Sequence, residues 1–149
     1  YEICACLVGS EMCIRDSYII AQSRKAISSG APLLQALIFH HPEDKLCWHI
    51  DDEYYFGNDF LVAPVMNSEN RRDVYLPEGQ WVNFFTGEVL EGGRWLKDLD
   101  VPLDEMPVYV RQGATIPVYP DEVECTDEMD LSKSAELHID NHFKGIFKD

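Results

Sequence analysis

The sequence is poor in basic residues. Its 149 residues include 12 Lys and Arg against 27 Asp and Glu, which gives a formal net charge of −15. Such a chain repels polyanions, so we expect neither nucleic acid nor an anionic membrane surface as a partner. No apolar run approaches the roughly 18 residues of a membrane-spanning helix, and no basic, apolar and small-residue succession marks a signal peptide. Neutral ligands are indifferent to this charge.

Cysteines are also few outside the first thirteen residues. Cys4, Cys6 and Cys13 are not spaced like a CxxC pair, and no histidine lies near them. They therefore indicate no metal site. Cys47 and Cys125 stand far apart and imply no disulfide framework, so we expect small, partly buried apolar side chains at both positions.

An unbroken apolar run, Phe60 to Val65, lies near the middle of the chain. Because no polar residue occupies alternate positions, neither face of this segment is expected to meet water. The pattern is typical of a strand in a parallel sheet that is covered on both faces. A buried helix segment looks similar at this length, but the flanking Gly57 and Pro64 and the β-branched Val62 favour a strand.

The segment before this run predicts α/β structure. Residues 18–29 form a short amphipathic helix pattern with Ser17 at its head, where a hydroxyl can cap the first turn. Gly30 can end the helix in a left-handed conformation, and Pro32 prevents its continuation. Residues 33–39 then predict another strand.

The segment after Met66 has a different pattern. Short alternating runs are separated by turn signals every six to nine residues, which is typical of an antiparallel β-sandwich. No Gly/Ser linker, repeat or low-complexity tract divides the chain, so the expected domain boundary near Met66 rests on this change of pattern. The expected strands are 73–76, 80–85, 88–91, 94–97, 108–110, 114–116 and 136–139.

Several blocks occur in the order found in glycoside hydrolase family 31, which contains α-glucosidases and α-xylosidases. The resemblance runs from about Tyr18 to about Pro120, and the ordered set is much more specific than any single block. Gln35 departs from the family, in which arginine is usual. The blocks are Gly30-Ala31-Pro32, His41-Pro42-Glu43-Asp44, Asp52-Glu53-Tyr54-Tyr55-Phe56-Gly57, Phe60-Leu61-Val62-Ala63-Pro64-Val65, Val74-Tyr75-Leu76-Pro77-Glu78-Gly79-Gln80-Trp81, Thr86-Gly87, Gly92-Gly93, Pro102-Leu103-Asp104 and Pro107-Val108-Tyr109-Val110-Arg111-Gln112-Gly113.

The resemblance implies an α/β part followed by an all-β part. Residues 18–66 would be the last strands and helices of a (β/α)8 catalytic barrel, and residues 67–149 most of the following antiparallel β-sandwich. A complete barrel takes about 250 residues, so this chain is expected to be a fragment. Residues 1–17, which lack clean periodicity, are expected to be non-native adapter sequence; the alternative is a native barrel strand followed by a helix cap at Ser17.

The parent enzyme implied by the resemblance is a retaining hydrolase of α-linked glucosides or xylosides. It uses an aspartate nucleophile and an aspartic acid/base, with no metal or organic cofactor. The motifs that carry these aspartates lie on earlier barrel strands and have no match here, so no catalytic residue is assigned and the fragment is expected to be inactive alone. The alternative is a sugar-binding or structural β-sandwich module.

Candidate contact residues come from the loop that follows residues 33–39. His40 and His41 would lie at the carboxyl end of a barrel strand and could touch substrate, although loop histidines with ordinary solvation are the favoured interpretation. Their spacing to His49 matches no zinc site. Asp51 and Asp52 are adjacent, whereas retaining glycosidases need two carboxyl groups about 5 Å apart across the scissile bond.

The remaining candidates are aromatic or acidic. Asp52 and Glu53 are more plausibly the first residues of a short helix that ends at Gly57. Trp81 and Trp95 lie in strand patterns and are expected in the core or in cross-strand pairs, whereas Trp48 is the better candidate for an exposed sugar contact. Residues 121–130 carry six acids without the spacing of an EF-hand, so we expect a solvated loop.

Overall fold

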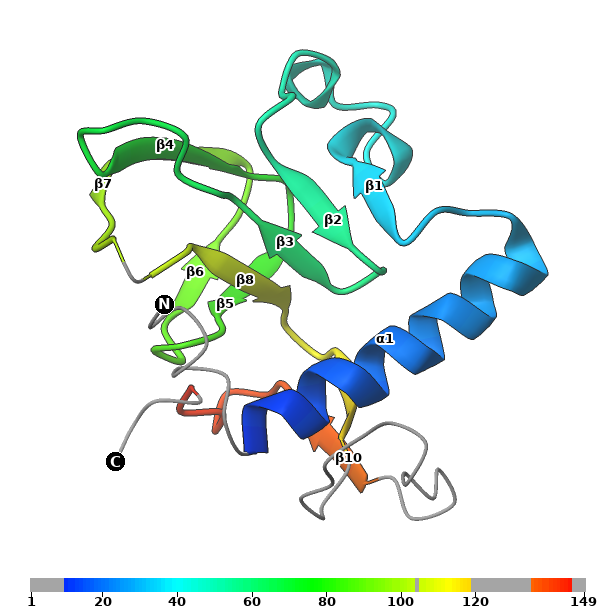
Figure 1. The fold of residues 1–149 in the computed structure, drawn as a ribbon. Coiled ribbons are helices and arrows are strands. Elements are labelled where there is room, and N and C mark those ends of the chain that lie inside the picture. Colours follow the sequence, from blue (N-terminus) through cyan, green and yellow to red (C-terminus); the bar gives the residue numbers. More distant parts are fainter. Residues whose placement is uncertain (1–9, 104, 119–134, 146–149) are drawn as a thin grey trace.

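The computed structural model describes residues 10–103, 105–118 and 135–145, which form one α-helix, two short 3-10 helices and ten strands (Figure 1). In chain order they are α1 (Ser10–Ser29), β1 (Leu34–Ala36), η2 (Leu37–Phe39), η3 (Lys45–Trp48), β2 (Tyr54–Phe56), β3 (Phe60–Val62), β4 (Arg71–Leu76), β5 (Gln80–Asn83), β6 (Val89–Glu91), β7 (Arg94–Asp100), β8 (Val108–Arg111), β9 (Thr115–Val118) and β10 (Ala135–His138).

The strands form three sheets, and every strand pair in the described residues is antiparallel. The central sheet has six strands in the order β1-β2-β3-β8-β5-β6. Two further sheets, β4–β7 and β9–β10, have two strands each. Residues directly opposite one another share a face of a sheet, so Leu34, Phe56 and Phe60, which are paired in register, point the same way.

The two faces of the central sheet carry separate apolar cores. One core contains Tyr55, Leu61, Trp81 and Tyr109 from the sheet, together with side chains from β4, η2 and η3. The other contains Phe60, Val62 and Val110, and α1 contributes Tyr18 to it while β9 contributes Ile116. We call the first the closed face and the second the helix face. The alternation of side chains along each strand sends neighbours to opposite cores.

The central apolar run is buried as expected, but its strand is not parallel. Phe60, Leu61 and Val62 are 6%, 0% and 6% exposed. β3 pairs antiparallel with β2 on one side and with β8 on the other. The prediction of a parallel strand was wrong. An unbroken apolar run indicates only that both faces of a strand are covered and does not indicate the direction of its neighbours. Here a different layer covers each face.

The barrel elements expected before Met66 also differ. β1 is only three residues long, because Leu37 to Phe39 turn into a 3-10 helix instead of extending the strand. The segment after Asp52 and Glu53 is not a short helix but strand β2, in which Tyr55 is buried and its two neighbours are half-buried. The central sheet joins strands from both sides of residue 66. Described residues 30–66 therefore show no barrel strand.

The helix and the strands after Met66 agree better with the predictions from the sequence. α1 covers the expected 18–29 but starts at Ser10, so Ser17 is a buried interior residue and not the cap. Residues 1–9 lie outside the described residues, and the non-native origin of residues 1–17 stays a prediction. The expected strands after Met66 are confirmed as β4 to β10. In the described part of the chain, α1 and the other helices are too short or too polar to cross a membrane.

Candidate functional site

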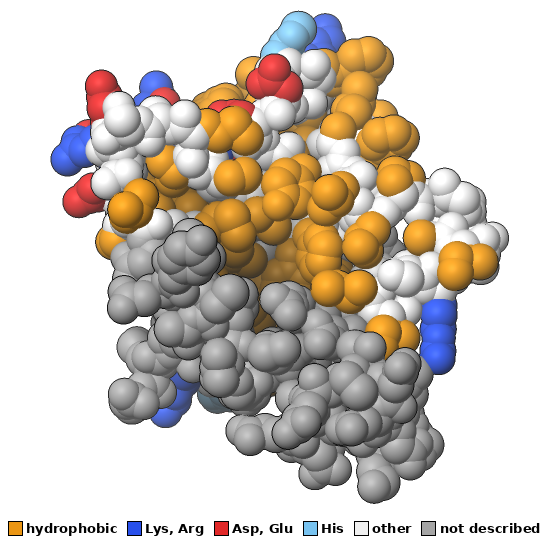
Figure 2. Space-filling model, viewed as in Figure 1, with side chains coloured by type: hydrophobic (Ala, Val, Ile, Leu, Met, Phe, Trp, Pro, Cys, Tyr) orange, Lys and Arg blue, Asp and Glu red, His pale blue; other side chains and the backbone are white. Residues whose placement is uncertain are grey.

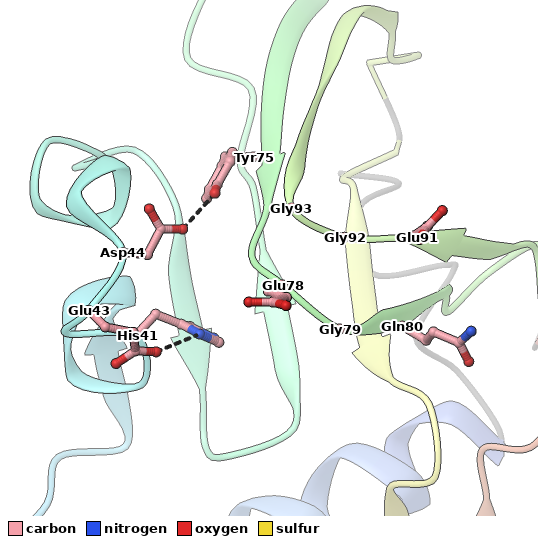
Figure 3. Close-up of a pocket in the computed structure, with 10 residues that line it drawn as sticks. All are labelled: His41, Glu43, Asp44, Tyr75, Glu78, Gly79, Gln80, Glu91, Gly92 and Gly93. Carbon is pink, nitrogen blue, oxygen red and sulfur yellow. Dashed lines mark hydrogen bonds and ion pairs between the residues drawn. The ribbon is translucent and has the colours of Figure 1, made fainter.

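A pocket of about 660 Å³ lies between the loop that carries His41 and two strand turns (Figure 3). The loop forms one wall with His41, Glu43 and Asp44. The β4–β5 turn and the β6–β7 turn form the other, and Glu78 extends from it toward His41. A volume of this size is typical of small-molecule sites. The remaining lining residues are Tyr75, Gly79, Gln80, Glu91, Gly92 and Gly93.

Two hydrogen bonds from the surrounding fold hold the Asp44 carboxylate in place. Its Oδ2 accepts from the Tyr75 hydroxyl at 2.5 Å, and its Oδ1 accepts from the backbone N–H of Leu46 at 3.0 Å, which caps η3. The hydrogen bond from Tyr75 lowers the pKa of the Asp44 carboxyl, and burial raises the pKa of the Tyr75 hydroxyl. Asp44 therefore stays ionised at neutral pH and is unsuited to donate a proton.

His41 joins this pocket to a cluster beneath it. Its Nε2 lies 2.8 Å from the Tyr55 hydroxyl on β2, and the Arg111 guanidinium on β8 donates to the same hydroxyl at 3.1 Å. Arg111 also stacks over the rings of Tyr55 and Trp81, at 5.2 and 5.8 Å from their centroids. Burial and the nearby Arg111 charge lower the pKa of His41, so its imidazole is neutral at pH 7.

His40 packs against the same tyrosine instead of pointing to a ligand. Its ring centroid lies 4.1 Å from that of Tyr55, and its buried Nε2 has no hydrogen-bond partner among the described residues. Burial, followed by the charge of Arg111, lowers the pKa of His40 to about 4. Both candidate histidines thus belong to one packed cluster, His40–His41–Tyr55–Arg111, and not to the end of a barrel strand.

A second polar cluster is buried where β2 begins. The Glu53 side chain is 0% exposed; its Oε1 accepts from the Tyr75 backbone N–H at 2.8 Å and lies 3.3 Å from the Arg72 guanidinium. Arg72 also donates to the backbone oxygens of Asp52 and Pro64. Burial outweighs these bonds and raises the pKa of Glu53 to about 7. Although this is the pKa of a general acid, a side chain with no exposed surface cannot reach a substrate.

Asp51 and Asp52 do not form a catalytic pair. The Asp52 carboxylate lies 3.1 Å from Arg72 and Asp51 is exposed. The described residues contain no group of three or more His, Cys, Asp or Glu side chains that could hold a metal ion. Cys47 is buried as expected, and burial raises its pKa to about 12. Residues Cys4, Cys6, Cys125 and 121–130 lie outside the described residues, as does the side chain of Cys13.

The three tryptophans have three different environments. Trp81 is 1% exposed and donates its Nε1–H to the Pro77 carbonyl at 2.8 Å, which confirms a core position. Trp95 is 38% exposed and is not a core residue; it forms the other expected arrangement, a cross-strand pair with Tyr75, at 5.2 Å between ring centroids. Trp48 is 60% exposed as expected, with its Nε1–H bound to the Pro42 carbonyl at 3.0 Å.

Sequence reasoning missed Tyr55 and Arg111, which organise the main polar cluster. They lie 56 positions apart and meet because β2, β3 and β8 are neighbours in the central sheet. The one available signal was the position of Arg111 directly after the apolar run Val108 to Val110. The arrangement can bind polar groups and hold residues in place, but the lowered pKa of Asp44 leaves this carboxyl unsuited to donate a proton.

Comparisons with known proteins agree with this geometry. Residues 30–116 match the family model for the glycosyl hydrolase family 31 C-terminal domain. Alpha-glucosidase 2 of Bacillus thermoamyloliquefaciens is 33% identical over 125 residues, which cover 83% of this chain and 14% of that enzyme.

Two solved structures share the fold. The family 31 dextranase of Flavobacterium johnsoniae complexed with isomaltotriose is 32% identical with a TM-score of 0.68, covering 74% of this chain and 14% of the dextranase. A family 31 α-xylosidase from a soil metagenome complexed with xylose is 37% identical with a TM-score of 0.69, covering 76% and 17%.

This chain therefore spans between 14% and 17% of the length of these relatives. The family model covers more than half of the chain, and relatives found by sequence and by structure are 32–37% identical to it. Both comparisons point to the same family. The chain belongs to glycosyl hydrolase family 31, and its residues 30–116 match the C-terminal domain of that family.

Proposed function

We propose that this chain is the non-catalytic C-terminal part of a longer retaining hydrolase of α-linked glucosides or xylosides. Relatives named α-glucosidase, α-xylosidase and dextranase support this substrate class. The structure supports the non-catalytic role, because Glu53, whose pKa is raised, is fully buried and the half-buried pocket carboxylate Asp44 is held ionised. The parent enzyme uses no metal or organic cofactor.

The observation that carries this proposal is the position of α1. The helix ends at Ser29, whereas the family model for the C-terminal domain begins at residue 30. Nevertheless, α1 packs on the central sheet through Tyr18, whose ring lies 4.9 Å from that of Phe60. We propose that α1 is a helix of the preceding (β/α)8 barrel and that the β-domain braces the barrel by holding it. The start of the match favours a boundary near residue 30 over one near Met66.

The test compares this chain with the full-length parent enzyme. The coding sequence upstream of Tyr18 is recovered, and both proteins are assayed with nitrophenyl α-glucoside and nitrophenyl α-xyloside. We expect turnover by the parent and none by the 149-residue chain. A parent that hydrolyses neither compound would overturn the proposed substrate class.

A second candidate, a sugar-binding module, is favoured by one observation. Trp48 is 60% exposed with its indole N–H tied to the backbone, which fixes the ring as a flat apolar surface. Titration of the isolated chain with isomaltose and with xylose tests it. Binding at millimolar concentration or tighter that is lost in a Trp48→Ala variant would support this module, and the absence of binding would exclude it for these sugars.

A further inference from the structure

The helix face of the central sheet carries a latch that holds α1. The Tyr18 hydroxyl lies 3.1 Å from the Phe56 carbonyl and 3.0 Å from Asp59 Oδ2, and it accepts from the Asp59 backbone N–H at 3.2 Å. Gln22, one turn along the helix, donates to the same carboxylate at 3.5 Å. We call Tyr18, Gln22 and Asp59, with Gly57, the latch. It fixes the helix to the turn between β2 and β3.

Gly57 shows how close this contact is. A Cβ at this position would lie 2.4 Å from the Tyr18 hydroxyl and 2.8 Å from Gln22 Cγ. Its φ of +64° is also in the left-handed region that favours glycine. The helix therefore lies directly on the backbone of the turn, and α1 and the turn belong to one packed core.

The apolar surface of the helix face continues past α1. Two cross-strand rows run over β1, β2 and β3: Leu34–Phe56–Phe60 and Ala36–Tyr54–Val62. Phe60 and Val62 are each 6% exposed, whereas Leu34 is 57% exposed, Ala36 is exposed and Tyr54 is half-buried. The layer that packs on this face of the sheet therefore covers β3 but does not reach β1. Hydrophobic side chains also gather over the middle of the molecule between β4 and α1 in Figure 2.

The part of the helix face that is left uncovered, a strip formed by Leu34, Ala36 and Tyr54, lies beside α1. A narrow cleft of about 40 Å³ separates α1 from the start of β1, lined by Lys25 and Ala26 on one side and by Leu33 and Gln35 on the other. By contrast, the closed face is covered by β4–β7 and by η2, whose Leu37 is 0% exposed. The open strip is therefore a feature of the helix face.

We infer that the β1–β2 strip of the helix face, formed by Leu34, Ala36 and Tyr54, is the surface on which the rest of the catalytic barrel packs. This inference rests on the proposed function, which makes α1 a barrel helix. Adjacent packed helices have their axes 8–10 Å apart, so an element next to α1 in the barrel would lie over the strip. The relatives, about five to six times as long as this chain, have the additional residues to cover it.

Cysteine accessibility tests this surface. In a background with Cys4, Cys6, Cys13 and Cys125 changed to serine, Leu34→Cys and the control Phe39→Cys are made in the isolated chain and in the full-length enzyme. Phe39 is 68% exposed and follows Leu37 of the closed face, so it makes a matched exposed control. Both variants are labelled with a maleimide, and Ala36→Cys gives a second reading of the strip.

In the isolated chain, both Leu34→Cys and Phe39→Cys are expected to react quickly. In the full-length enzyme the Leu34→Cys thiol is expected to react at least about tenfold more slowly than in the isolated chain, whereas the Phe39→Cys control keeps its rate. Equal rates for Leu34→Cys in the two proteins, or protection of the control instead, would overturn the inference. Hydrolysis of nitrophenyl glycosides by the same full-length protein is read separately, so a wrong docking surface and a wrong substrate class give different results.

Discussion

The two faces of the central sheet are covered in different ways. The closed face is completed by strands and 3-10 helices of the matched C-terminal domain, and one buried and one partly buried polar cluster lie at its edge. The helix face is completed by α1, which precedes the matched residues, and it remains open over β1. The difference indicates that one face stabilises the domain itself, whereas the other serves contact with the rest of the enzyme.

The largest expected effect lies in the core of the closed face. Leu61 is fully buried there, so a Leu61→Ala change removes apolar burial and leaves a cavity, which costs about 2–5 kcal/mol of stability. Leu34→Ala on the open strip is the matched control and is expected to change stability by less than about 0.5 kcal/mol in the isolated chain. Urea unfolding of the isolated chain measures both. Equal losses would show that the two faces do not differ.

The next effect concerns the latch. In Gly57→Ala the new Cβ meets the Tyr18 hydroxyl and Gln22 at a positive φ, so we expect a loss of about 2 kcal/mol. Gly30→Ala, also at a positive φ but with open space around the Cβ, is the control for backbone strain alone. Thermal unfolding followed by circular dichroism distinguishes them. A Gly57→Ala variant no less stable than Gly30→Ala would contradict close contact of α1 with the turn.

A pH-dependent effect is expected at the edge of the closed face. Burial raises the pKa of Glu53 to about 7, above its ordinary 4.5, so the folded state keeps a proton that the unfolded state releases. The contribution is fully present below pH 4.5 and is lost as the pH rises through about 7. Glu53→Gln is expected to remove this loss, on the order of 2 kcal/mol across the window. Denaturation midpoints at pH 5 and pH 8 measure it, and exposed Glu105→Gln is the control. Parallel pH profiles for wild type and Glu53→Gln would contradict the raised pKa.

The smallest effect separates the hydrogen bonds of the latch from its packing. Tyr18→Phe keeps the ring contacts with Phe56 and Phe60 but leaves the Asp59 N–H and carboxylate without the hydroxyl, at a cost of about 1 kcal/mol. Tyr54→Phe, on the same face, removes a hydroxyl without a partner among the described residues. A double-mutant cycle of Tyr18→Phe with Asp59→Asn measures the coupling, and zero coupling would show that the latch bonds do not act together.

The sequence predicted which segments are buried more reliably than how they pair. Burial of Phe60 to Val62 followed from an apolar run, and burial of Trp81 from its place in a strand pattern, because exclusion from water leaves a direct mark on the sequence. The direction of the neighbouring strands leaves no such mark, which is why β3 was expected in a parallel sheet and pairs antiparallel. The resemblance of the ordered blocks identified the family correctly even though the local fold before Met66 differed.

The polar clusters could be predicted only in part. His40 and His41 were singled out as candidates, but their partners Tyr55 and Arg111 come from strands that are distant in sequence. Glu53 was assigned to a helix start because acids favour that position, whereas burial beside Arg72 decides its environment. Contacts of this kind depend on the order of the strands in the sheet, and short-range sequence patterns carry no information about that order.

The central claim, that this chain is a bracing domain whose enzyme carries its reactive carboxyl groups elsewhere, can be tested by one comparison. Release of nitrophenol from the α-glucoside and the α-xyloside is followed with the purified 149-residue chain and with the complete parent at equal molar concentration. The account predicts release by the parent alone. Release by the short chain at a rate comparable to that of the parent would contradict it.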